Sequence, residues 1–155
     1  MVATSSRSHR AADLTPGRVG DQLADSSGLS PHQRYARAKP SLLLLHEDKR
    51  RRHPGLEIVD VHPGIVASDF GRYLGWLGAV LKTVAAPVLT SPAAAAAHLI
   101  HLATIDDDLA ATYYHRRQPG RPSRLVVEPD LREEVRRIAD VHFTPPKDSP
   151  PPRNR

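Results

Sequence analysis

Apolar and polar residues alternate along the chain in patterns that predict one long helix early in the sequence. Ser30 followed by Pro31 is a typical helix start, with a capping hydroxyl and a proline at the first helical position. The helical pattern then runs over residues 31–52 and ends at a Pro-Gly pair. Pro40 lies inside it, and an interior proline removes one backbone hydrogen bond at a cost of about 3 kcal/mol. We therefore expect either a kink at Pro40 or a helix that tertiary packing holds in place.

The segment after this helix predicts a buried strand. Leu56, Ile58, Val59 and Val61 form a short, largely β-branched run between two Pro-Gly pairs. Because the run is mostly apolar at both alternating faces, we expect a parallel strand that helices cover on both sides.

The rest of the chain continues the alternation of helices and strands. We expect an apolar helix over residues 74–84, a helix after Ser91 and Pro92, a short strand in "ATYYHRR", and an amphipathic helix over residues 129–143. Four residues recur at helical spacing in that last segment: Leu131, Val135, Ile138 and Val141. Residues 13–33 are rich in Gly, Ser, Asp and Pro and predict a loop, and the proline-rich residues 144–155 predict a disordered tail.

This order of elements predicts an α/β fold, the C-terminal half of a doubly wound, Rossmann-like parallel sheet, over residues 1–143. A Gly-x-Gly-x-x-Gly turn, which would hold the pyrophosphate of a dinucleotide, does not occur in the sequence. We therefore expect the N-terminal, dinucleotide-binding half to lie outside this chain.

Composition narrows the function classes. The 155 residues suffice for one modest domain, and the absence of cysteine excludes disulfides and thiolate metal sites. Residues 73–89 form an apolar stretch that Lys82 and Pro87 interrupt, short of the roughly 20 apolar residues of a spanning helix. Together with a polar start that lacks an apolar leader, this predicts a cytoplasmic protein without a transmembrane segment, although contact with a membrane surface remains open.

The net charge of +5 would suit an anionic partner. The basic run at residues 49–52 also suits the negative end of a helix dipole, and aromatic residues that could stack on bases are missing nearby. We therefore expect no nucleic-acid partner. His98 and His101 lie three residues apart on a predicted helix, and without a third ligand we interpret them as surface histidines and expect no metal site.

The chemically most informative pair is Tyr35 and Lys39, which lie one helical turn apart on the same face. An ordinary tyrosine side chain has a pKa near 10, and a neighbouring positive charge favours its phenolate form. Such a pair could donate a proton in catalysis. Taken alone, the pair is more typical of an ordinary helix surface.

Several segments together resemble the short-chain dehydrogenase/reductase family. "YARAK" is similar to its Tyr-x-x-x-Lys motif, "HPGIVASDF" to its His-Pro-Gly-x-Val-x-Thr segment, and "VATSSRSHR" to the end of the strand that carries its catalytic serine. "TSPAAAAAHLIHLAT" and "ATYYHRR" resemble the later helix and strand of the retinol-dehydrogenase-like branch, as does the long gap between Ser6 and Tyr35. The resemblance covers roughly residues 2–143.

The resemblance implies an NAD- or NADP-dependent oxidoreductase that interconverts an alcohol and a carbonyl. Tyr35 would be the proton donor, Lys39 would hold the nicotinamide ribose, and Ser6 would bind the substrate oxygen. The implied cofactor-binding residues are Tyr35, Lys39, Pro63, Gly64, Val66 and Ser68. Ser68 stands where the family often has threonine and keeps the hydroxyl. An apolar lid, and hence a small apolar substrate, is suggested by Leu74, Trp76, Leu77 and Val80.

Because the pyrophosphate-binding half is missing from the chain, we expect the 155 residues alone to be inactive and to bind no dinucleotide. An alternative is a non-enzymatic remnant or a basic binding peptide from a truncated gene. The choice between NAD and NADP, the identity of the substrate and self-association stay open at the level of sequence.

Overall fold

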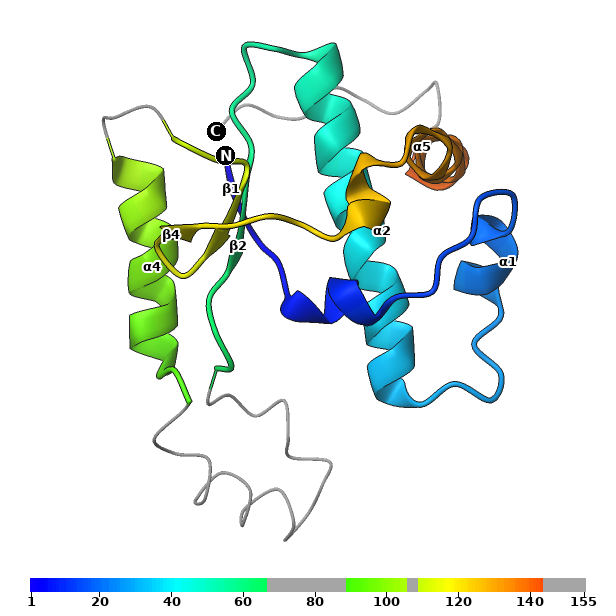
Figure 1. Ribbon diagram of the computed structural model, residues 1–155, viewed down its shortest axis with the longest axis horizontal. Coiled ribbons are helices and arrows are strands. Elements are labelled where there is room, and N and C mark those ends of the chain that lie inside the picture. Colours follow the sequence, from blue (N-terminus) through cyan, green and yellow to red (C-terminus); the bar gives the residue numbers. More distant parts are fainter. Residues whose placement is uncertain (67–88, 106–108, 144–155) are drawn as a thin grey trace, which may run out of the picture.

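The computed structural model describes residues 1–66, 89–105 and 109–143. Its centre is a four-stranded sheet in the order β1-β2-β3-β4, with β1 at Val2–Thr4, β2 at Val59–His62, β3 at Tyr113–His115 and β4 at Gln118–Pro119 (Figure 1). β1, β2 and β3 are parallel, whereas β4 returns antiparallel to β3. The described residues thus form an α/β unit with a small mixed sheet.

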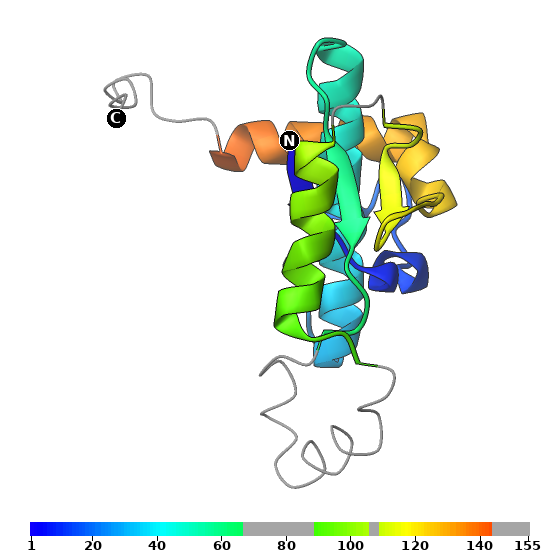
Figure 2. The ribbon, with the colours of Figure 1, turned by 90° about the vertical axis from the view of Figure 1, so that its left-hand side faces the viewer.

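Helices cover both faces of the sheet. α4, at Pro92–Thr104, lies on one face, where Leu102 packs with Val59, Val61 and Tyr114. α2, at Pro31–Arg52, lies on the other, and Leu43 packs there against Tyr113. Figures 1 and 2 show α4 and α2 on opposite sides of the strands.

Further short elements pack around α2 on the side away from α4. These are η1 (Arg7–Ala11), α1 (Val19–Ala24), η3 (Arg124–Val127) and α5 (Pro129–Phe143). In Figure 1, α5 and α1 lie beyond α2 as seen from the sheet. Their shared core is a second apolar cluster of Leu14, Val19, Leu44, Leu131 and Val135.

α2 confirms the predicted helix and its bounds. The Ser30 hydroxyl accepts the N–H of Gln33 and the Gln33 side chain accepts the N–H of Ser30, which completes a capping box ahead of Pro31. Pro40 is buried within a helix that continues through it. Of the two expected outcomes, the described contacts favour tertiary packing, since the buried ring lies on the side of α2 that other elements cover.

The predicted helix after Ser91 and the strand in "ATYYHRR" are confirmed by α4 and β3. The predicted helix over residues 129–143 is confirmed by α5, but Val141 is 80% exposed and lies outside the core that Leu131 and Val135 enter. The spacing of apolar residues thus predicts a buried face that is one turn longer than the face that is buried in the structure.

Three expectations need correction. Residues 13–33 are not loop throughout, because Val19 is buried in α1, and Glu134 of α5 accepts the N–H groups of Gly17 and Val19 at 2.7 and 2.9 Å. β2 is not apolar on both faces, because Asp60 is buried on the side of α2. The sheet is not wholly parallel, since β4 forms a tight hairpin with β3. The helix predicted at residues 74–84 and the tail at 144–155 lie outside the described residues.

β1 lies at one edge of the sheet as the described strands form it. Val59 donates to the carbonyl of Met1 and Ser5 donates to the carbonyl of Val61, so the odd-numbered residues of this segment face β2. The main-chain groups of Val2 and Thr4 point the other way because parallel strands alternate. This edge pairs with no other strand of the described ranges.

Candidate functional site

The candidate site lies at the carboxyl edge of the parallel strands. β1 runs into Ser5, whose N–H donates to the carbonyl of Val61 at 2.7 Å, so the end of β1 is fixed beside the end of β2. η1 starts directly after β1 and packs on α2. The helix α2 precedes β2 and runs antiparallel to it, which brings the start of α2 to this same edge (Figure 1).

Tyr35 and Lys39 are brought together as predicted. Both side chains are half-buried near the start of α2, and the Lys39 Nζ lies 5.1 Å from the centroid of the Tyr35 ring. Pro40 therefore does not carry Lys39 away from Tyr35. A lysine at this distance from an aromatic ring makes a cation–π contact, in addition to placing a positive charge beside the phenol.

Ser6 is half-buried at the step from β1 into η1. Its hydroxyl accepts the Ser8 N–H at 3.2 Å and also lies 3.2 Å from the Ser8 hydroxyl. It therefore caps η1 at the candidate edge. Its neighbour Ser5 is buried, and the Ser5 hydroxyl has no hydrogen-bond partner among the described residues.

Pro63, Gly64 and Val66 follow β2 at the same edge. Pro63 is buried, and Gly64 has a φ of +99°, a conformation that a side chain strains. Val66 forms an isolated parallel bridge with Thr90. Ser68 and the proposed lid residues, which are Leu74, Trp76, Leu77 and Val80, lie outside the described residues.

A buried polar network on the α2 face of the sheet was not predicted. Asp60 is fully buried in β2, and its carboxylate accepts from His46 Nδ1 at 2.7 Å and from Arg50 at 3.2 Å. Arg50 also donates to the carbonyl of Ile58 at 3.0 Å. The network joins the second half of α2 to β2. The acidic residue inside an otherwise apolar strand is the sequence signal that could have pointed to it.

A group of histidines at the same edge, which consists of His9, His62 and His115, was not predicted either. Burial lowers the pKa of His62 to about 4, with further contributions from His115, Arg7, His9 and Arg116. His9 is fully buried: its Nδ1 donates to the carbonyl of Ser6, and its Nε2 accepts the N–H of Ser123 at 3.0 Å. Burial lowers the pKa of His9 as well. These imidazoles are therefore neutral at pH 7.

The edge thus combines a phenol beside an ammonium group, a hydroxyl, and neutral imidazoles. Such groups can hold and transfer a proton next to a carbonyl oxygen. Within the described ranges, no group of three or more His, Asp or Glu side chains is arranged to hold a metal ion. No helix of the described residues is long and apolar enough to cross a membrane.

Comparisons with protein families and with curated proteins assign no family to this chain. No known protein-family profile matches the sequence, and no curated protein matches it.

Proposed function

We propose that this chain is the catalytic, substrate-side half of a short-chain dehydrogenase/reductase that interconverts an alcohol and a carbonyl. The proposal rests on one observation. Tyr35 and Lys39 lie together near the start of α2, with the Lys39 Nζ 5.1 Å from the centroid of the Tyr35 ring. α2 packs on η1, the segment that follows Ser6. Ser6 in turn follows β1, whose end is bonded to the end of β2, directly before Pro63.

In this proposal each side chain has a distinct task. The Tyr35 hydroxyl donates its proton to the carbonyl oxygen during reduction and takes it back from the alcohol during oxidation. Lys39 places its ammonium group beside the phenol, with Nζ 5.1 Å from the ring centroid. The Ser6 hydroxyl orients the substrate oxygen toward Tyr35.

NAD or NADP would supply or accept the hydride when bound. Lys39, Pro63, Gly64 and Val66 fit the nicotinamide-ribose end of such a cofactor by their position at the carboxyl edge. The described residues offer no glycine-rich turn for the pyrophosphate, so we propose that a dinucleotide-binding half supplies it. The outer edge of β1, which pairs with no described strand, is where a further parallel strand of that half would add.

The substrate in this proposal is a small apolar alcohol or carbonyl compound, which rests on the apolar composition of residues 74–80. The chain by itself is expected to bind no dinucleotide and to turn over no substrate.

A fusion tests the proposal. The first half of a related short-chain reductase, through the helix that precedes its serine strand, would be joined to Met1, and oxidation of NADPH or NADH would be followed with apolar ketones and aldehydes. We expect carbonyl-dependent oxidation by the fusion and none by the 155-residue chain. A folded fusion that binds the dinucleotide yet reduces no carbonyl would favour the non-enzymatic alternative.

A further inference from the structure

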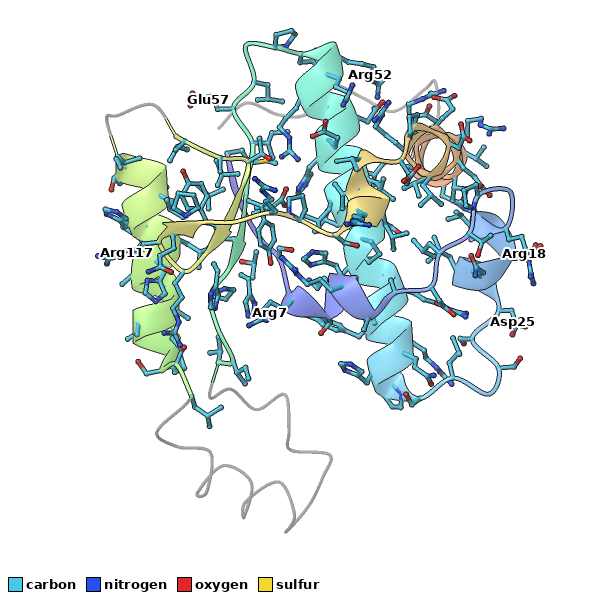
Figure 3. All side chains as sticks on the ribbon, viewed as in Figure 1. Arg7, Arg18, Asp25, Arg52, Glu57 and Arg117 are labelled. Atoms are coloured by element: carbon cyan, nitrogen blue, oxygen red, sulfur yellow. The ribbon has the colours of Figure 1, made fainter. Side chains whose placement is uncertain are left out.

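Four cationic or imidazole side chains from three elements surround the end of β2. His62 closes β2, His115 closes β3, Arg116 follows it, and Arg7 begins η1. The rings of His62 and His115 are stacked, with centroids 5.1 Å apart and planes 13° from parallel. Figure 3 shows Arg7 close to this end of the sheet, whereas Arg18 lies on the far side of the molecule.

The position of Arg116 is built into the fold. Its backbone has a φ of +59°, which non-glycine residues adopt rarely, and its N–H donates to the carbonyl of His62 at 2.8 Å. Its guanidinium lies 3.4 Å from the Thr90 hydroxyl. A Cβ at Gly64 would lie 3.2 Å from Arg116 Nε and 2.5 Å from Thr90 Oγ1, so the glycine makes room for this arrangement. Arg116 is the first residue of the two-residue turn between β3 and β4, a position at which hairpin turns require a positive φ.

Within the described ranges, no carboxylate forms an ion pair with the arginines of this group. Arg7 and Arg116 are both exposed. Asp60 faces the same side of β2, but His46 and Arg50 already hold its carboxylate. The nearest described charges around the stacked histidines are therefore arginines.

The His62 ring can form a further hydrogen bond. It is 7% exposed, and its buried Nδ1 has no partner among the described residues. The groups that lower its pKa besides burial are Arg7 and His9 from η1, His115 from β3, and Arg116 directly after β3. A buried imidazole nitrogen without a partner is uncommon in folded proteins and is a position where a ligand group gains a hydrogen bond.

We propose that Arg7, Arg116, His62 and His115 form a binding site for the phosphate group of a small molecule. A phosphate monoester carries about −1.5 to −2 charges at pH 7, which matches two arginines that form no ion pair with a described carboxylate. Arginine binds phosphate oxygens through paired N–H donors, and histidine can add a further donor when the anion favours its protonated form. The site lies at the carboxyl ends of parallel strands, where α/β sheets commonly bind ligands.

This inference goes beyond the proposed oxidoreductase activity and does not depend on it. Neither Tyr35 nor Lys39 takes part in the site, so phosphate binding can be measured on the 155-residue chain whether or not a fusion is active. Failure of one proposal therefore leaves the other intact.

The test is a titration with inorganic phosphate at constant ionic strength, followed by NMR of the imidazole groups. Arg116→Gly removes the guanidinium and also relieves the backbone strain, so this variant is expected to fold. Arg116→Asn, which also tolerates a positive φ, is the second variant. Arg18→Gln is the matched control, because Arg18 is an exposed arginine remote from the site.

We expect saturable shifts of the His62 and His115 signals with phosphate and much smaller ones with acetate. Both Arg116 variants should weaken phosphate binding by at least about tenfold, the lower end of what a charged hydrogen bond contributes. Arg18→Gln should leave the dissociation constant unchanged. The proposal is overturned if phosphate causes no saturable shift, or if the Arg116 variants bind it as tightly as the unaltered chain.

Discussion

Acid is expected to destabilise the folded chain through protonation linked to His62. In the folded chain burial and the neighbouring arginines and histidines lower its pKa from 6.5 to about 4, whereas the unfolded chain keeps an ordinary histidine. Between these two values the unfolded chain therefore binds more protons than the folded one. It follows that the free energy of unfolding falls as the pH drops below 6.5 and levels off near 4.

The size of the effect follows from the same shift. One pKa unit is worth about 1.4 kcal/mol, so the full difference between 6.5 and about 4 corresponds to about 3 kcal/mol. Between pH 7 and pH 5 the realised part is about 2 kcal/mol, because the unfolded histidine is nearly fully protonated at pH 5 while the folded one is still neutral.

The assay is urea unfolding at pH 7 and pH 5 in buffers without phosphate. His62→Gln keeps a polar side chain but cannot titrate, so its loss of unfolding free energy on acidification should be smaller than that of the unaltered chain by about 2 kcal/mol. His9, His98 and His115 also have lowered pKa values and contribute in the same direction to both proteins. His53→Gln, at an exposed histidine, is the control. Equal pH dependence in the unaltered chain and in His62→Gln would refute the reasoning.

Three further substitutions test other parts of the structure by urea unfolding. Asp60→Asn should lower the free energy of unfolding by about 3 kcal/mol, since it removes a fully buried carboxylate that pairs with Arg50 and leaves Arg50 only its more exposed partner Glu47. Asp130→Asn at an exposed site should change the free energy of unfolding by less than about 1 kcal/mol, and similar losses in the two variants would contradict the network. Gly64→Ala should cost about 1 to 3 kcal/mol because of its φ of +99° and the 2.5 Å approach to a side chain, whereas Gly55→Ala, with open space around it, should be near neutral. Tyr113→Phe should leave stability unchanged or slightly raised, because the buried hydroxyl has no partner among the described residues, and a clear loss of stability would show that it does.

Local signals in the sequence predict much of this fold. The bounds of α2 follow from Ser30 and Pro31, and α4 follows from the same signal at Ser91 and Pro92, because capping is a short-range interaction. The pair Tyr35 and Lys39 follows from helical spacing alone.

Features that depend on long-range contacts could not be predicted in the same way. α1 is stabilised by Glu134, which lies more than a hundred residues away in sequence, so its own glycine-rich composition predicts a loop. The cluster around His62 combines residues from the ends of two strands and the start of η1, and only the sheet register brings them together. In the sequence, Asp60 is a charged residue in an otherwise apolar strand. Its burial is explained only by the contacts of its carboxylate with His46 and Arg50, which come from a different element.

The central claim is that Tyr35 is a proton donor, and one comparison tests it most directly. In the fusion described above, the rate of carbonyl reduction would be measured for Tyr35→Phe and, as a matched loss of a phenolic hydroxyl, for Tyr113→Phe. General acid catalysis typically contributes about 10²- to 10⁴-fold, so Tyr35→Phe should lower the rate by that factor without loss of folding, while Tyr113→Phe should leave it unchanged. A fusion that reduces its substrate equally well with phenylalanine at position 35 would contradict the account.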